Sequence, residues 1–72
     1  MISNEDRWNL IKNIADKHKG ERPGQALFNV LYDEYPLVAE QICGSTFDPF
    51  YDDAKITLFK FKVLKLFNEM IP

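Results

Sequence analysis

Apolar positions recur every three or four residues along most of this chain, which is the period of an amphipathic helix. The first such run includes Trp8 and Ile11. Ser3 precedes it as a candidate N-cap, and Gly20 follows it at a position that suits the end of a helix. We therefore predict a first helix over residues 4–19.

Prolines divide the middle of the chain into two further helices. Pro23 suits the first turn of a helix, and Pro36 disfavours a helical conformation in the residue before it. Pro36 can itself open the next helix, which Gly44 would close. The pattern predicts helices over residues 23–35 and 36–43.

The last periodic run predicts a helix over residues 53–70, capped by Asp52 or Asp53. One face of this helix would carry six apolar residues, namely Ile56, Phe59, Val63, Leu66, Phe67 and Met70. Residues 56–64 are also rich in β-branched and aromatic side chains, so a strand is the alternative. The length of the run, without Gly or an internal Pro, favours the helix.

These elements predict an all-α fold, a single domain over residues 1–72 built from about four helices with short connections. At this length, stability depends on a dense core. We expect the core to consist of Trp8, Ile11, Leu27, Phe28, Leu31, Val38, Ile42, Phe59, Val63 and Phe67.

The loop over residues 44–52 follows neither a helical nor a strand period. Its sequence includes Phe47, Asp48, Pro49, Phe50 and Tyr51. So apolar a loop either closes one end of the core or faces a partner, and the sequence leaves that choice open. Asp48 before Pro49 is typical of a turn.

One polar residue on the second helix is predicted to support this loop. Asn29 lies among apolar neighbours, where a side-chain amide needs a hydrogen-bond partner. We expect that partner to be the backbone of residues 44–49.

Charge is unevenly distributed along the chain, although the net charge is only −2. Residues 23–53 contain six acidic residues and no Lys or Arg, whereas residues 54–72 contain four Lys and one Glu. Either the acidic middle and the basic last helix pack together and compensate, or an acidic surface faces a basic partner. The second interpretation makes Asp33, Glu34 and Glu40 candidate partner-binding residues.

A second apolar row on the last helix consists of Leu58, Phe61 and Leu64. A helix in a small bundle needs only one apolar face. Either the other helices wrap around this one, or the second row contacts another protein or a second copy in a homodimer. These three residues are therefore the other candidate partner-binding residues.

The sequence predicts no catalytic, metal-binding or cofactor-binding residues. His18, the only histidine, has no evident nucleophile or orienting acid, and we expect it to end the first helix. Cys43, the only cysteine, is expected to be a buried apolar residue. The spacing of Asp48, Asp52 and Asp53 is not that of a calcium loop.

Partners and location follow from the same composition. A single cysteine suits a reducing compartment, and no run is long and apolar enough to span a membrane, so we expect a cytoplasmic protein. Because no cofactor-binding residues are predicted, we also expect no cofactor. Lys55, Lys60, Lys62 and Lys65 raise the alternative of nucleic-acid binding. An isoelectric point near 5.2 and the absence of Arg from that helix make nucleic acid the less favoured partner.

Two sequence blocks carry a resemblance to a known group of proteins. The blocks are Arg22-Pro23-Gly24-Gln25-Ala26-Leu27-Phe28-Asn29 and Gly44-Ser45-Thr46-Phe47-Asp48-Pro49-Phe50-Tyr51-Asp52-Asp53. They resemble small uncharacterised proteins of phages, prophages and other bacterial mobile elements, which have a GQxxFN helix and a G[ST]xxDPFYxD loop. The resemblance implies a bacterial or phage setting, in which small accessory proteins often bind host proteins. We therefore expect a non-enzymatic protein that acts by protein–protein interaction.

Overall fold

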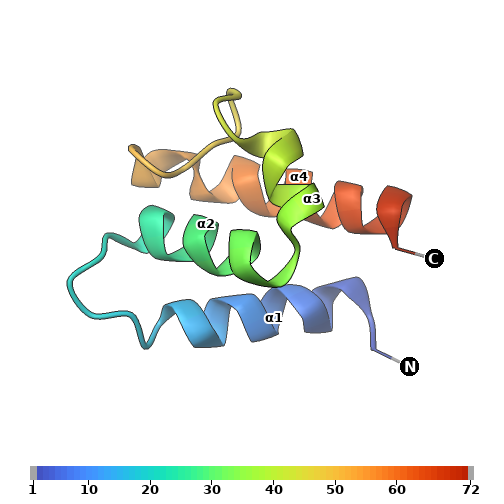
Figure 1. Cartoon of the computed structure of the whole chain (residues 1–72), viewed down its shortest axis with the longest axis horizontal. Helices are drawn as coiled ribbons and strands as arrows, with labels where there is room; N and C mark the ends of the chain where they lie inside the picture. The colour runs from blue at the N-terminus through green and yellow to red at the C-terminus, as the bar shows by residue number, and fades with distance from the viewer. Residues whose placement is uncertain (1, 72) are drawn as a thin grey trace.

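The structure of the chain is a computed structural model that describes residues 2–71 (Figure 1). In chain order its elements are α1 (Asn4–Ala15), α2 (Pro23–Glu34), α3 (Pro36–Ile42), the 3₁₀ turn η1 (Asp53–Lys55) and α4 (Ile56–Met70). The predicted all-α class is confirmed. The strand alternative for residues 56–64 is wrong, because α4 covers them. Met1 and Pro72 of the predicted domain lie outside the described residues.

The arrangement is a small bundle in which α1 and α2 lie side by side and antiparallel (Figure 1). The short α3 turns away from the end of α2, and α4 packs against both α1 and α3. The start of α1 and the end of α4 lie at the same end of the molecule (Figure 1). The segment between α3 and η1 returns across the molecule to the start of α2.

α1 begins with a capping box and ends earlier than predicted. Ser3 Oγ accepts a hydrogen bond from the Asp6 backbone N–H at 3.0 Å, and Asp6 Oδ2 accepts one from the Ser3 N–H at 3.3 Å. The predicted end at residue 19 is wrong. After Ala15 the backbone tightens, because His18 N–H donates to the carbonyl of Ala15, three residues before it, and Gly20 then reverses the chain with φ +86°.

Prolines begin α2 and α3, and both helices have bounds within one residue of the predictions. Tyr35 leaves the helical region, with φ −138° and ψ 68°, because Pro36 follows it. α3 ends at Ile42, and Cys43 is extended at ψ 125°. Cys43 is exposed, so its predicted burial is wrong: the chain leaves α3 at this residue and turns outward at Gly44, where φ is +76°.

Residues 53–70 form two elements rather than the one predicted helix. Asp52 caps η1, since its side chain accepts a hydrogen bond from the Ala54 N–H at 2.9 Å. α4 follows from Ile56. Asp53, the other candidate cap, instead accepts a hydrogen bond from the Gly24 N–H at the start of α2, at 2.9 Å. The two aspartates therefore have different roles, one local and one between elements.

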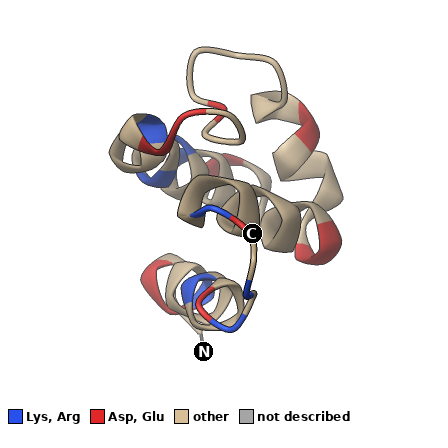
Figure 2. Ribbon diagram, turned by 90° about the vertical axis from the view of Figure 1, so that its left-hand side faces the viewer, with Lys and Arg blue, Asp and Glu red and all other residues tan. Residues whose placement is uncertain are grey.

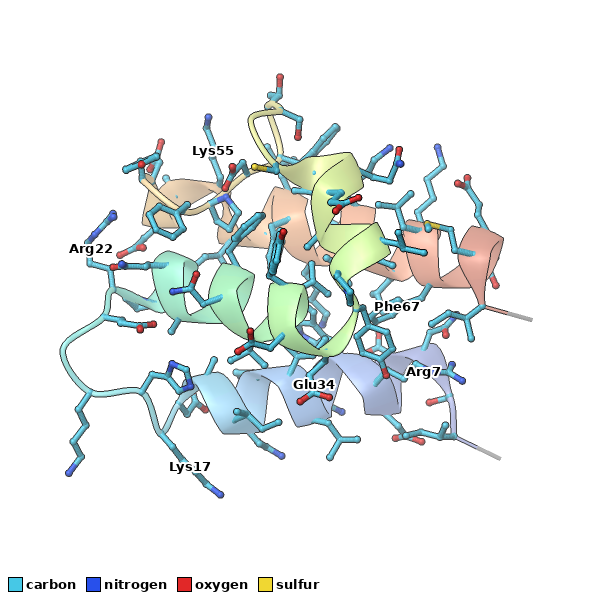
Figure 3. The ribbon with its side chains drawn as sticks, in the orientation of Figure 1. Arg7, Lys17, Arg22, Glu34, Lys55 and Phe67 are labelled. Carbon is cyan, nitrogen blue, oxygen red and sulfur yellow. The ribbon has the colours of Figure 1, made fainter. Side chains whose placement is uncertain are left out.

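All ten predicted core residues are buried. Phe59 and Phe67 are fully enclosed, and Phe67 lies between the helices in Figure 3. The Trp8 and Phe59 rings meet edge to face, with centroids 5.7 Å apart. Five further residues complete the hydrophobic core cluster, namely Ala15, Ala26, Val30, Ala39 and Leu66. Met70, predicted on the core face of the last helix, is 40% exposed, because it belongs to the final turn of α4.

The loop over residues 44–52, which we call the aromatic loop, closes one end of the core, and this answers the question that the sequence leaves open. Pro49 is fully buried, and Phe47 and Phe50 are half-buried against the core. The Phe50 ring meets that of Phe28 edge to face, at 6.1 Å and 89°. Tyr51 is the exception, since it is 84% exposed. The predicted turn is present, because Asp48 accepts hydrogen bonds from the backbone within the loop.

Candidate functional site

The second apolar row on α4 is only partly covered by the rest of the chain. Leu58 is 48% exposed and Phe61 is 64% exposed, whereas Leu64 is half-buried against the core. Phe59, between the first two, is fully buried, because successive residues of a helix point about 100° apart. The other helices therefore do not wrap α4. We call Leu58 and Phe61 the α4 row.

Lysines border the α4 row. Lys62 holds its ammonium nitrogen 5.3 Å from the centre of the Phe47 ring, and Lys65 is exposed. Lys60 points toward α1, where its nitrogen lies 3.9 Å from Glu5 Oε2. The row and its neighbours thus form a surface that is apolar in the middle, with positive charge from Lys62 and Lys65 and with the charge of Lys60 offset by Glu5.

The predicted acidic residues lie on α2 and α3, on either side of the junction between these helices. Asp33 and Glu34 end α2, and Glu40 lies on α3; all three are exposed. Figure 3 shows Glu34 at the other end of α2 from Arg22. Figure 2 shows the acidic positions of this junction and the lysines of α4 on opposite sides of the molecule.

An apolar hollow of about 270 Å³ lies at the same junction. Its lining consists of Glu34, Tyr35, Pro36, Leu37, Val38, Met70 and Ile71. Leu37 is 65% exposed and Met70 is 40% exposed, so two partly exposed apolar side chains line this hollow together with Glu34. We call this hollow with Asp33 and Glu40 the acidic corner. The sequence predicted its charges but not the apolar residues between them.

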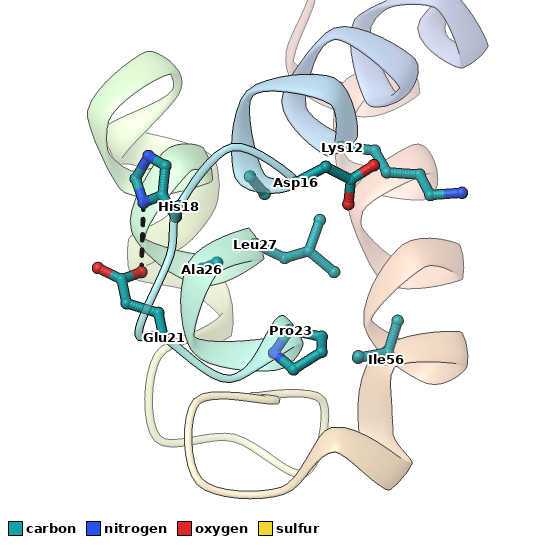
Figure 4. Close-up of a pocket in the computed structure, with 9 residues that line it drawn as sticks. Lys12, Asp16, His18, Glu21, Pro23, Ala26, Leu27 and Ile56 are labelled. Carbon is teal, nitrogen blue, oxygen red and sulfur yellow. Dashed lines mark hydrogen bonds and ion pairs between the residues drawn. The ribbon is translucent and has the colours of Figure 1, made fainter.

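A second hollow, of about 290 Å³, lies where the α1–α2 connection passes the start of α4 (Figure 4). Pro23, Leu27 and Ile56 face a common space in it. His18 Nδ1 lies 3.3 Å from Glu21 Oε2, and Figure 4 shows these two lining residues facing each other. The expectation that His18 lacks a nearby acid is therefore wrong, because the chain reversal at Gly20 brings Glu21 back to it.

The predicted support of the aromatic loop by Asn29 is also wrong. Asn29 Nδ2 donates to Glu21 Oε2 at 3.4 Å, so its amide joins the pair formed by His18 and Glu21. The loop is tied to α2 by other groups. Arg22 Nη2 donates to the Phe50 carbonyl at 2.6 Å, and Asp53 accepts from Gly24.

The structure shows no assembled reactive centre around these residues. The lining of the hollow in Figure 4 includes no Ser, Thr or Cys that could serve as a nucleophile beside His18. Within residues 2–71, no three His, Cys, Asp or Glu side chains gather as a metal site would require. Asp48, Asp52 and Asp53 each accept hydrogen bonds from backbone N–H groups.

Comparison with known proteins gives no functional information, so a functional proposal has to rest on the α4 row and the acidic corner. The sequence matches no protein-family model and no curated protein, and the structure resembles no solved structure closely enough to count as a match. Among the described helices, none is both long and apolar enough to cross a membrane.

Proposed function

We propose that this chain is a non-enzymatic protein-binding domain whose main contact surface is the α4 row. One observation carries the proposal. Leu58 and Phe61 are largely exposed on a helix whose opposite side, including Phe59, is fully buried. A Phe side chain that is 64% exposed beside a half-exposed Leu gives the domain an apolar contact surface. Aromatic side chains of this kind contribute strongly when a partner buries them.

The charges around the row indicate the partner's chemistry. α4 and η1 carry four lysines and two acids, and Lys62 and Lys65 lie at the helical spacing that places them next to Leu58 and Phe61. A complementary partner presents an apolar patch bordered by carboxylates. Such pairing favours encounter and orientation, and it weakens as salt screens the charges.

The biological setting is proposed from the sequence resemblance. The blocks over residues 22–29 and 44–53 resemble those of small phage and mobile-element proteins. In that setting the partner is a host protein in the bacterial cytoplasm, and the domain modulates it by occupying a surface. The two blocks themselves lie against each other through Arg22 and Phe50, so we assign them a structural role that leaves α4 free for the partner.

The lysines of α4 also define the nucleic-acid alternative, which the contacts favour less. Lys60 faces Glu5, Lys62 lies over the Phe47 ring, and Asp52 and Asp53 precede the helix. These acids reduce the positive potential that a phosphate backbone requires. Under this alternative, the doubly substituted Lys60→Glu/Lys62→Glu protein would lose all retention of DNA or RNA at low salt.

The test is affinity capture from a bacterial lysate that has been treated with nuclease. Three tagged proteins are compared: the wild type, the Leu58→Asp/Phe61→Asp variant and a Tyr51→Asp variant. Tyr51 is a matched control because it is an exposed aromatic residue outside the row. Circular dichroism checks that all three fold. We expect one protein to be retained by the wild type and by Tyr51→Asp and lost with the row variant. Equal recovery by all three would overturn the proposal.

A further inference from the structure

The two charged surfaces of this chain are complementary to each other but cannot meet within one molecule. Between residues 2 and 71 the ion pairs are those of His18 with Glu21 and of Lys60 with Glu5. None of them joins an acid of the α2–α3 junction to a lysine of α4. The compensation between the acidic middle and the basic last helix, one of the two interpretations of the sequence, therefore does not take the form of ion pairs between these groups. Figure 2 shows the reason, since they lie on opposite sides.

Each surface also carries two apolar side chains, and their exposed fractions are similar on the two surfaces. The α4 row offers Phe61, which is 64% exposed, and Leu58, which is 48% exposed. The acidic corner offers Leu37, which is 65% exposed, and Met70, which is 40% exposed. One surface is bordered by lysines and the other by carboxylates. The acidic corner thus has the chemistry that the α4 row requires of a partner.

We propose that the acidic corner of one copy of this chain binds the α4 row of a second copy. Leu37 and Met70 would pack against Phe61 and Leu58, and the carboxylates around Glu34 would face the neighbouring lysines. This inference rests on the proposed function, because it names a partner for the same row. It gives Lys62 and Lys65 acidic partners that the junction acids of the same molecule do not supply.

The contact would join two different surfaces, so it is head-to-tail rather than symmetric. Each added copy leaves one row and one corner free, and assembly therefore grows with concentration. A symmetric dimer through α4 alone, as the sequence suggested, would instead bring Lys62 and Lys65 of both copies to one interface. Because each surface is small, we expect weak association that high salt weakens further.

The experiment is sedimentation of the full chain over a concentration series that reaches the millimolar range at low salt. The row variant is Leu58→Ser/Phe61→Ser, and the corner variant is Glu34→Gln/Leu37→Ser. All four residues are exposed, so both variants are expected to fold. Neither variant introduces a charge that could create a new contact.

We expect the average mass of the wild type to rise with concentration and each variant alone to remain monomeric. An equimolar mixture of the variants retains one intact row and one intact corner, so it should form a one-to-one complex of twice the monomer mass and no larger species. A wild type that stays monomeric, a variant that associates alone, or a mixture that stays monomeric would overturn the inference.

These results are independent of the capture experiment. If the wild type is monomeric at every concentration but the Leu58→Asp/Phe61→Asp variant of the capture experiment still loses a captured protein, the inference fails and the proposed function stands. If self-association follows the expected pattern and no other protein depends on the row, the second copy is the partner of the row and the host-protein part of the proposed function fails.

Discussion

The carboxylate of Asp53 accepts a hydrogen bond from the backbone N–H of Gly24 at 2.9 Å, which joins the start of η1 to the start of α2. The first N–H groups of a helix have no partner within the helix, so an acid from another element can satisfy one of them. The negative charge of that acid is also stabilised by the positive end of the helix dipole. Together with the bond from Arg22 to the Phe50 carbonyl, the bond between Gly24 and Asp53 holds the end of the aromatic loop against the start of α2.

The close approach at this junction makes Gly24 sensitive to substitution. A Cβ added there would overlap the Pro49 carbonyl oxygen and lie 2.9 Å from Asp53 Oδ1. We expect Gly24→Ala to lower the free energy of unfolding by about 1–3 kcal/mol, as overpacking does. Chemical denaturation measures the loss, and amide chemical shifts should change over residues 49–53.

Gly20→Ala is the comparison for this substitution. Its backbone is left-handed, at φ +86°, but the space around it is open. It should cost about 1–2 kcal/mol through backbone strain alone, without shift changes in residues 49–53. A Gly24→Ala protein with wild-type stability and an unperturbed loop would show that the junction is looser than described.

Phe50 and Tyr51 separate the core part of the loop from its exposed part. Phe50 packs edge to face against Phe28, whereas Tyr51 is 84% exposed. We expect Phe50→Ala to cost about 3 kcal/mol, near the lower end for a Phe truncation because the ring is only half-buried. Tyr51→Ala should change stability by less than about 0.5 kcal/mol. Thermal melts of both proteins measure this, and equal losses would contradict the assignment of the loop.

The α4 row should be dispensable for folding. Phe61 and Phe59 are two residues apart on the same helix, but Phe61 is 64% exposed and Phe59 is fully buried. We expect Phe61→Ser to shift the free energy of unfolding by no more than about 0.5 kcal/mol. Phe59→Ala should cost about 3–5 kcal/mol, which is comparable to the whole stability of a small domain. Denaturant titration distinguishes the two, and a large loss from Phe61→Ser would place it in the core instead.

The start of α1 depends on the capping box at Ser3. Ser3→Ala removes the oxygen that accepts from the Asp6 N–H, and we expect a loss of about 1 kcal/mol. Asn13→Ala is the control, because Asn13 is exposed in the same helix and Ala favours helix formation. That control should be neutral or slightly stabilising. A Ser3→Ala protein as stable as the control would mean that the cap contributes little.

The sequence predicted those parts of the fold that depend on local rules. All ten core residues predicted from the helical period, from Trp8 to Phe67, are buried. The period predicts them because apolar residues three or four positions apart share one face of a helix, and that face packs inward. Pro23 and Pro36 marked helix starts because their ring geometry acts on neighbouring residues. The turn predicted at Asp48 also has a local cause, because Asp48 Oδ1 accepts a hydrogen bond from the Phe50 N–H two residues later.

What the sequence did not predict depends on contacts between distant segments. Asn29 pairs with Glu21, and Asp53 with Gly24, only because the chain reverses and the loop returns to α2. The same holds for the candidate surfaces. The charge of Glu34 could be read from the sequence, but the hollow beside it also needs Met70, which the packing of α4 brings to the α2–α3 junction.

The measurement that tests the central claim most directly is photo-crosslinking in bacterial cells. A photoreactive amino acid replaces Phe61 in one protein and Tyr51 in another, and both positions are exposed. We expect a discrete protein adduct from position 61 that position 51 does not give. An adduct from position 51 with none from position 61 would contradict the claim that the α4 row is the protein-binding surface.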